Sequence, residues 1–383
     1  MRYDAALAPC GSYDRQEVEE ALRLILEKTG GLDFVRPGMR VAVKVNLVAG
    51  LKPERAATVH PELVCALTRL LKERGAEVVV GDSPGGLFTA SFVGMVYDAC
   101  GMRRAEEFGA VMNGDFTQET ADYPEAVQAR CFPFTAYLKK ADAVIDVCKL
   151  KSHGMMGMSC AVKNMFGAIP GTVKPEFHYK YPRAEDFADM LVDVYEYIKP
   201  RLCICDGVIA MEGNGPTQGT PRKTGVLLAS ADGHLLDRLC AELIGLKPED
   251  VPTLSAAARR GLLPEEPDRD RIFGDPAKYA VPDFETAPAQ STVGFHLLGA
   301  GPAGRLADRV VTGILSPFPK LRSGECVGCG KCASICPAKA ITMKNKKPRI
   351  DRSVCIRCFC CQEFCPVGAM KIGRRAIVRL LGK

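Results

Sequence analysis

The same cysteine motif occurs twice near the C-terminal end of the sequence. Each copy has three cysteines at intervals of three residues, a fourth cysteine four residues later, and then a proline. The first copy is Cys326, Cys329, Cys332, Cys336 and Pro337, and the second is Cys355, Cys358, Cys361, Cys365 and Pro366. Thiolates at this spacing wrap closely around one metal centre. Structural zinc sites use separated pairs of Cys or His, and disulfide frameworks belong to exported chains, so the spacing indicates iron–sulfur clusters.

Both copies read C-x2-C-x2-C-x3-C-P, which resembles the ligand pattern of bacterial ferredoxins with two [4Fe–4S] clusters. In that pattern the fourth cysteine of each copy binds the cluster of the other copy. We therefore predict one cluster on Cys326, Cys329, Cys332 and Cys365, and a second cluster on Cys355, Cys358, Cys361 and Cys336. Such clusters transfer single electrons, which predicts a redox function. Cys360, between two ligands of the second copy, is expected to be a bystander thiol.

Length and composition are those of a globular protein. The 383 residues give room for two or three domains, and 47% of them are hydrophobic and 25% charged. We find no apolar run long enough to span a bilayer, and the first residues lack the layout of a signal peptide. Eighteen cysteines favour the reducing cytoplasm of an anaerobic or microaerobic cell.

Charge is distributed unevenly along the chain. Residues 319–383 contain 15 Lys and Arg against 3 Asp and Glu, whereas the remainder contains 36 against 42. Thiolate-bound clusters are anionic, so they offset part of the basic excess. We expect the rest, such as Lys344, Lys346, Lys347 and Arg349, to bind an acidic redox protein, a low-potential electron donor or acceptor. Nucleic acid is the weaker alternative, because no aromatic residues for base stacking lie among these charges.

The region before the cysteine motifs predicts an α/β body over residues 1–290. Strands are expected at 39–47, 76–80, 143–148, 201–205 and 225–229, and helices at 14–30, 61–75, 184–198 and 234–244. This alternation predicts a mostly parallel, helix-covered sheet, and it leaves open whether the body forms one lobe or two. After the body we expect a linker with an amphipathic helix (291–319), a small α+β domain of the ferredoxin type (320–372) and a basic tail (373–383).

Polar residues follow the ends of the predicted strands, where the binding crevice of an open α/β sheet lies. As residues that bind a ligand or cofactor we predict Lys44, Asn46, Asp82, Gly85, Gly86, Glu212 and Asn214, and as catalytic residues Lys151, His153 and Lys163. Lysines and glycine-rich turns favour a small anionic ligand, a carboxylate or a phosphate. The histidines and carboxylates of this region leave open an additional metal in the cleft. Each residue taken singly also has an ordinary structural explanation as a cap or a turn.

Nine cysteines lie outside the two motifs. The only close pair among them, Cys203 and Cys205, is expected to pack in the core of a strand, because free cysteine behaves as a small apolar residue. Cys148 and Cys160 flank the segment that carries Lys151 and His153. A nucleophilic role for Cys160 would require a lowered pKa.

Several of these segments resemble the family known as domain of unknown function 362. They are Lys44-Val-Asn46, Gly81-Asp82-Ser83-Pro84-Gly85, Lys151-Ser-His153-Gly154, Ser159 to Asn164 with Gly167 and Pro170-Gly171, and Glu212 to Pro216. Members of that family are often fused to a C-terminal ferredoxin domain, as the motifs indicate here. The resemblance implies no particular reaction. The order His153, Gly157, Lys163 and Pro170-Gly171 is also similar to that of nickel-pincer lactate racemases, which hold a nickel cofactor between two α/β domains.

Three hypotheses of function follow. The leading hypothesis is an iron–sulfur oxidoreductase, in which the clusters pass single electrons to an anionic substrate or cofactor in the α/β cleft. Lys44, Lys151 and Lys163 would then bind the anion, and His153 would donate a proton. The second hypothesis is an electron-transfer or partner-binding subunit without catalysis. The third is an isomerase with a metal cofactor of the racemase type, which would need no electron donor.

Overall fold

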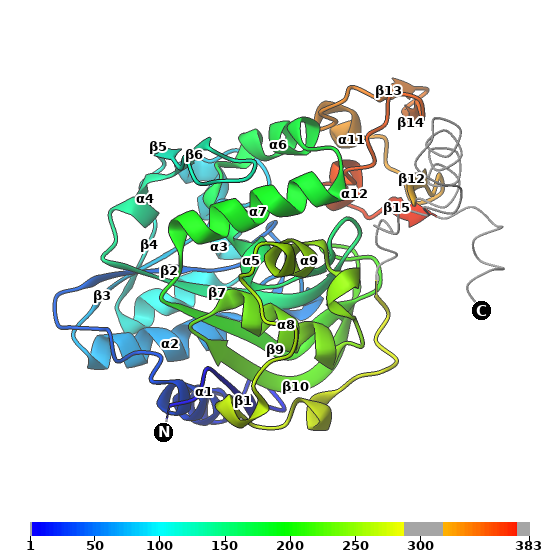
Figure 1. Ribbon diagram of the computed structural model, residues 1–383. Helices are drawn as coiled ribbons and strands as arrows, with labels where there is room; N and C mark the ends of the chain where they lie inside the picture. The colour runs from blue at the N-terminus through cyan, green and yellow to red at the C-terminus, as the bar shows by residue number, and fades with distance from the viewer. Residues whose placement is uncertain (1, 287–316, 374–383) are drawn as a thin grey trace.

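The computed structural model describes residues 2–286 and 317–373. Over these residues an α/β body carries a small cysteine-rich unit at one side (Figure 1). We call residues 317–373 the cluster unit. No helix among the residues described is long and apolar enough to cross a membrane.

A nine-stranded sheet forms the centre of the body, with the strand order β11-β1-β10-β9-β7-β2-β3-β4 and β8 paired to β7. Its strands are β1 (Ala5–Pro9), β2 (Arg40–Lys44), β3 (Glu77–Gly81), β4 (Ala110–Met112), β7 (Ala143–His153), β8 (Gly157–Ser159), β9 (Leu202–Glu212), β10 (Thr220–Ser230) and β11 (Ile272–Phe273). The five strands from β9 to β4 are parallel, whereas β10 is antiparallel to both of its neighbours. The predicted mostly parallel sheet is confirmed, and it forms one continuous body.

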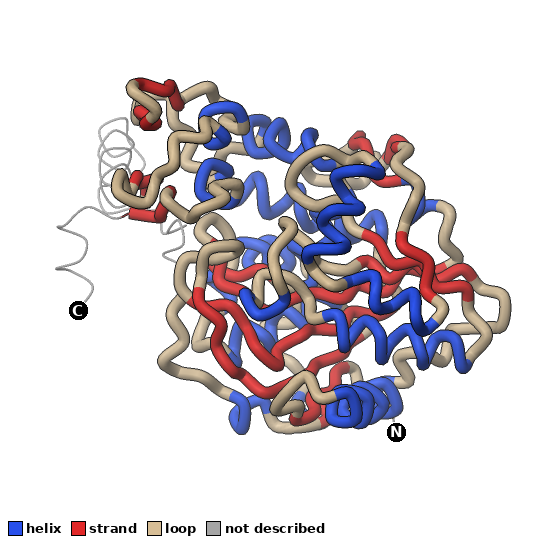
Figure 2. The backbone as a smooth tube through the Cα atoms, turned by 180° about the vertical axis from the view of Figure 1, so that it is seen from behind, coloured by secondary structure: helices blue, strands red, loops and turns tan. Residues whose placement is uncertain are grey.

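Helices cover both faces of this sheet (Figures 1 and 2). One face carries α1 (Arg15–Thr29), α2 (Pro61–Glu73) and α3 (Ala90–Ala99), and the other carries α5 (Ala161–Asn164), α7 (Ala184–Ile198), α8 (Gly233–Leu243) and α9 (Pro252–Arg259). Successive residues of a strand point to opposite faces. Val43 therefore joins the core beneath α1 and α2, whereas its neighbour Ala42 joins the core beneath α7 and α8.

Local signals account for several element ends. The Asp14 side chain accepts hydrogen bonds from the amides of Gln16 and Glu17, and Gly30 ends α1 in the left-handed conformation. Helix α7 has the bounds predicted from the sequence. Strands β7 and β9 extend well past their predicted ends, because β8 pairs with the end of β7 and β10 pairs along β9.

The cluster unit consists of two antiparallel strand pairs and two short helices. Its elements are β12 (Phe318–Leu321), α11 (Lys331–Ser334), β13 (Ile341–Lys344), β14 (Lys347–Ile350), α12 (Cys360–Glu363) and β15 (Met370–Gly373). Asn345 and Lys346, both with a positive φ, form the turn between β13 and β14. The expected linker helix and nearly all of the basic tail lie outside the described residues.

The remaining elements of the body are shorter. They are α4 (Ala136–Lys139), α6 (Lys174–Lys180) and the antiparallel pair β5 (Gln118–Asp122) and β6 (Cys131–Thr135). Of these, α6 matters for the site, because its first residue, Lys174, reaches the loop after β3.

Candidate functional site

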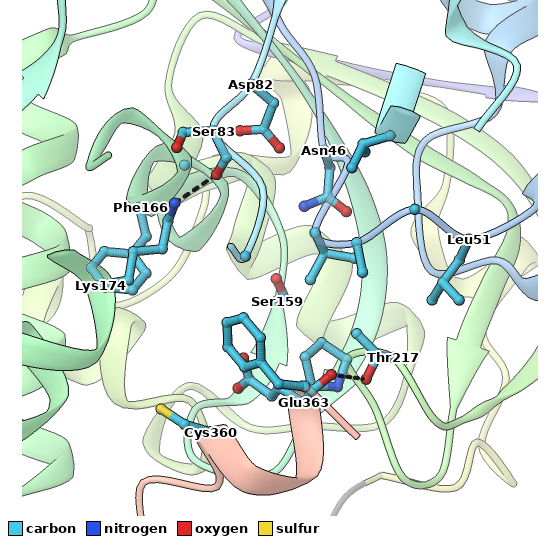
Figure 3. Close-up of a pocket in the computed structure, with 18 of the residues that line it drawn as sticks. Asn46, Leu51, Asp82, Ser83, Ser159, Phe166, Lys174, Thr217, Cys360 and Glu363 are labelled. Carbon is cyan, nitrogen blue, oxygen red and sulfur yellow. Dashed lines mark hydrogen bonds between the residues drawn. The ribbon is translucent and has the colours of Figure 1, made fainter. Parts of the chain in front are cut away.

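A cleft of about 490 Å³ lies between the body and the cluster unit. The body contributes residues from the ends of β2 and β3 and from the segment that follows β8, including Asn46, Asp82, Ser83, Lys163 and Lys174. The cluster unit contributes Lys331, Cys360, Glu363, Phe364, Cys365 and Pro366. Figure 3 shows Cys360 and Glu363 on the helix at one side of the cleft, with Asp82 and Ser83 across from them. The crevice thus lies at the carboxyl ends of parallel strands, where the sequence predicts it.

Two of the lysines near the cleft are neutralised by carboxylates. The Lys44 ammonium lies 2.9 Å from Asp82 Oδ1, and Lys149 Nζ lies 2.9 Å from Asp206 Oδ2. Lys44 is fully buried and also donates to Asn164 Oδ1. A side chain at Gly167 would collide with both Lys44 and Asp82, so only glycine leaves room for this pair. Lys44, which we predict to bind the anion, therefore already has a partner inside the protein.

Three other lysines, on the body side of the cleft, form no ion pair with a carboxylate among the described residues. Lys151 Nζ donates to Asn46 Oδ1 and to the Ala57 carbonyl, both at 2.7 Å. Lys174 donates to the Ser83 carbonyl at 2.6 Å, and Lys163 lies 5.9 Å from the centre of the Phe166 ring. These direct contacts are to neutral groups, and the charges of Glu363 and Asp82 offset part of the positive charge at longer range.

Burial shifts the titration of these lysines. It lowers the pKa of Lys151 to about 7, with a further contribution from the charge of Lys163, and it lowers the pKa of Lys174 to about 7. The pKa of Lys163 is lowered for the same reason. Lys163 and Lys174 keep part of their surface open to the cleft, whereas Lys151 is 1% exposed. The lowering of the pKa by burial is therefore best supported for Lys151, which has the least contact with solvent.

His153 does not line the cleft itself but lies beside Glu363 of the cluster unit, which does. Its Nδ1 accepts from the amides of Met155 and Met156, and its Nε2 lies 3.2 Å from Glu363 Oε1. Burial lowers the His153 pKa to about 4, so the ring is neutral at neutral pH with its proton on Nε2. Burial alone would raise the pKa of Glu363, but His153, Lys163 and His178 outweigh it and hold that pKa at about 2. Because His153 does not line the cleft, it positions Glu363 rather than facing a ligand.

Hydrogen bonds join the cluster unit to the body around the cleft. Thr217 Oγ1 donates to the Glu363 carbonyl at 3.0 Å, and Gln218 Nε2 donates to the Cys365 carbonyl at 3.0 Å. Gln362 Nε2 donates to the Asn214 carbonyl at 2.9 Å, and the Ile372 amide donates to Asn214 Oδ1 at 3.3 Å. Asn214, which the sequence predicts to bind a cofactor, instead lies in this junction.

The other predicted binding residues divide into two groups. Asn46, Asp82 and Gly85 line the cleft, and a Cβ at Gly85 would lie 2.6 Å from the Phe364 ring, so glycine allows the two parts to approach closely. Gly86 and Glu212 do not line the cleft. Glu212 accepts from the Glu285 amide at 3.1 Å, and the positive φ of Gly86 serves the turn after β3.

Cysteines from both copies of the motif lie together in the cluster unit. Cys336, Cys355, Cys358 and Cys361, which we predict as the ligands of the second cluster, line one small cavity together with Cys360. Cys332 interacts with Cys329 and Cys365 of the first set. The amides of Ala340 and Ala369 donate to the sulfur atoms of Cys336 and Cys365 at 3.3 and 3.2 Å. These equivalent bonds in the two halves fit thiolate ligands, whose electron density they would tune.

The histidines and carboxylates that left open an additional metal do not gather in the cleft. Among the residues described, one group of three His, Cys, Asp or Glu side chains could hold an ion, and it consists of Cys148, Cys160 and Cys205. His60 instead stacks on Tyr13, and His178 stacks on Phe187 at the wall of the cleft. Burial also raises the pKa of the Cys160 thiol, which does not favour a nucleophile there.

Sequence reasoning missed several residues of the cleft. Lys174 begins a short helix three residues after Pro170-Gly171 and carried no motif of its own. Glu363 is one of three acidic residues in the basic C-terminal region, and this was the only available signal for it. Thr217 and Gln218 gave none, whereas His178 was among the histidines that left open an additional metal.

The fold and the cysteines define an α/β protein with a C-terminal iron–sulfur domain. The chain belongs to the family described as domain of unknown function (DUF362), whose model matches residues 41–242. Residues 325–369 match a 4Fe-4S dicluster domain. The predicted fusion of these two domains is therefore confirmed, and the chain carries the ligands of an iron–sulfur electron-transfer domain.

Similar proteins give no reaction for this chain. A thylakoid-associated protein of Synechocystis sp. is 33% identical over 301 residues, which cover 75% of this chain and 88% of that protein. The lactate racemase apoprotein from Thermoanaerobacterium thermosaccharolyticum is 11% identical with a TM-score of 0.38, over 62% of this chain and 56% of that one. A Thermotoga maritima protein is 16% identical with a TM-score of 0.37, over 59% of this chain and 58% of that one. The chain thus spans under two thirds of each of these structures.

Proposed function

We propose that the protein is an iron–sulfur oxidoreductase that transfers single electrons to an anionic substrate or cofactor in the cleft. The observation that carries the proposal is the composition of the cleft wall. Lys151, Lys163 and Lys174 line it from the body, and Cys365, a predicted cluster ligand, lines it from the cluster unit. A ligand bound by these lysines would lie beside the thiolate of the first cluster.

The charge balance of the cleft supports an anionic ligand. Three lysines there lack a carboxylate partner among the described residues, and Glu363 supplies one negative charge. Buried cations without partners are costly, and a bound carboxylate or phosphate would offset that cost through charge-assisted hydrogen bonds. The excess of positive over negative charge favours a dianion over a neutral molecule.

Lys151 and Lys174 support proton transfer at the same site. A proton donor works best when its pKa lies near the operating pH, and both lysines have a pKa of about 7. Clusters on the eight cysteines would supply the electrons, and these two ammonium groups would supply protons to the reduced ligand. His153, which we predict from the sequence as the proton donor, would instead hold Glu363 in place.

A test of this site uses chemical reduction of the clusters. We would reduce anaerobically purified protein with dithionite, remove the excess, and follow the cluster absorbance while adding small carboxylates and phosphate esters one at a time. At least one class of anion should reoxidise the clusters. Lys163→Met removes a charge without leaving a hydrogen-bond acceptor unpaired, and it should weaken the response by about tenfold or more.

The control for Lys163→Met is Lys139→Met, which removes an exposed lysine of the body that does not line the cleft. Both variants should retain the full iron content. Equal responses of wild type and Lys163→Met would contradict the site assignment. If no small anion reoxidises the wild-type clusters, the chain is better described as an electron-transfer subunit.

A cytoplasmic location also stays a prediction, based on the cysteine content.

A further inference from the structure

Four buried cysteines that the proposed function does not use bring their sulfur atoms together inside the body. Cys148 lies in β7, Cys160 directly precedes α5, Cys205 lies in β9 and Cys240 lies in α8. Cys160 is 1% exposed and the other three are fully buried. None of them lines the cleft. They come from four separate parts of the sequence, so their spacing along the chain did not indicate a site.

The distances between these sulfur atoms are close to those around a bound metal ion. Cys160 Sγ lies 3.4 Å from Cys148 Sγ, 3.5 Å from Cys205 Sγ and 3.6 Å from Cys240 Sγ. Cys205 also interacts with Cys148 and Cys240. A tetrahedral ion with metal–sulfur bonds of about 2.3 Å holds its ligands about 3.8 Å apart. The sulfur atoms of Cys148, Cys160 and Cys205 all lie within 4.8 Å of one another, and Cys240 lies beside Cys160, so a small movement of these three thiols and a further movement of Cys240 would admit one ion.

The surrounding elements hold the four thiols in place. Cys148 and Cys205 are directly paired residues of the adjacent parallel strands β7 and β9. Asp237, less than one turn before Cys240 in α8, accepts from the amides of Ala161 and Val162 at 2.7 and 3.2 Å. This contact fixes the start of α5, and with it Cys160, against α8. The group thus takes one sulfur atom each from β7, β9 and α8, and one from the residue before α5.

Thiol packing without a metal is the ordinary explanation for buried cysteines. It accounts for Cys10, Cys65 and Cys100, which have no thiol neighbour within the described ranges and whose raised pKa values follow mainly from burial. It does not account for three thiols at one point with a fourth, Cys240, 3.6 Å from one of them. A group of Cys148, Cys160 and Cys205 whose sulfur atoms all lie within 4.8 Å of one another has the geometry of a ligand set.

We propose that Cys148, Cys160, Cys205 and Cys240 bind one thiophilic metal ion, for which Zn²⁺ is the best fit. A closed, all-thiolate set with no position open to solvent is typical of a structural zinc site. Thiolates around Zn²⁺ leave a net negative charge, and the Lys149 ammonium, which acts on Cys205, offsets part of it. The ion would cross-link the sheet to α5 and α8. This proposal is independent of the proposed redox function.

The test is a metal analysis of the full-length protein with its clusters intact. We would purify it without oxygen from zinc-supplemented medium and measure zinc and iron per chain. Wild type should hold one zinc in addition to the cluster iron, and zinc-edge X-ray absorption should show sulfur neighbours at about 2.3 Å. Cys160→Ala removes the thiol that contacts the other three, and it should lower the zinc content at least about tenfold with the iron content unchanged.

The matched control is Cys65→Ala, which removes a fully buried thiol of α2 that has no thiol neighbour. It should keep the zinc. If Cys160→Ala fails to fold, wild-type zinc with a sulfur shell decides the question, provided that the cluster iron content is full. Absence of zinc from wild type, a disulfide between any two of the four cysteines, or equal zinc in wild type and Cys160→Ala would overturn the proposal. The last result would show that the zinc binds elsewhere in the chain.

Discussion

At the scale of single residues, the cleft is defined by lysines that form no ion pair with a carboxylate of the described residues. Lys44 and Lys149 are paired with carboxylates, whereas Lys151, Lys163 and Lys174 contact only neutral groups. A protein that needed these lysines only for packing would gain stability by replacing them with apolar residues. Their retention in one cleft is therefore best explained by a ligand that carries the missing negative charge.

The titration of these lysines predicts how anion binding depends on pH. A bound anion raises the pKa of Lys151 and Lys174 above about 7, so binding takes up protons and weakens as the pH rises past that value. We would measure the dissociation constant of sulfate, whose charge is constant, from about pH 6 to about pH 9. The affinity should fall by up to about tenfold per pH unit for each lysine that titrates.

Lys151→Met serves as the comparison for this pH dependence. This substitution should weaken sulfate binding at low pH. The affinity should also fall less steeply as the pH rises, because only Lys174 then titrates near pH 7. An affinity that stays constant or increases across the range would contradict the electrostatic account of the cleft.

At the scale of elements, the sequence predicts best the helix bounds that depend on residues close together in the chain. Asp14 and Gly30 mark the two ends of α1, and the apolar periodicity of residues 184–198 gives the bounds of α7. Strand β1 was missed because its short segment has no polar alternation, and α3 was missed because Gly94 interrupts it. The contact between His153 and Glu363 was beyond prediction, since it depends on how the cluster unit docks on the body.

The docking of α12 can be tested at one of its hydrogen bonds. Thr217→Val keeps the shape of the side chain but removes the donor to the Glu363 carbonyl, at a cost of about 1 kcal/mol. Amide hydrogen exchange in α12 should become about fivefold faster if docking limits its opening. Thr253→Val, at a buried position in α9, is the control and should leave α12 unchanged. Unaltered exchange in Thr217→Val would show that this bond does not hold the unit in place.

At the scale of the whole molecule, the cluster unit connects the cleft with the outer surface. Cys365 lines the cleft, whereas Cys329, predicted for the same cluster, is exposed to solvent. The exposed turn between β13 and β14 lies beside this surface, because the Lys346 carbonyl is 2.7 Å from the position that a Cβ at Gly328 would occupy. Lys344 and Lys346 therefore stand next to the surface where a donor protein would deliver an electron.

This arrangement predicts that reduction by an acidic, low-potential redox protein depends on ionic strength. Opposite charges speed the encounter at low salt and are screened as salt rises, since the Debye length is about 10 Å at 0.1 M. In stopped-flow experiments the bimolecular rate of cluster reduction should fall as salt increases. The double variant Lys344→Gln, Lys346→Gln should be slower at low salt and converge with wild type at high salt. The control Lys139→Gln, Lys140→Gln removes the same charge from the exposed surface of the body. Equal slowing in both double variants would mean that net charge alone sets the rate, and a rate that rises with salt would exclude an acidic partner at this surface.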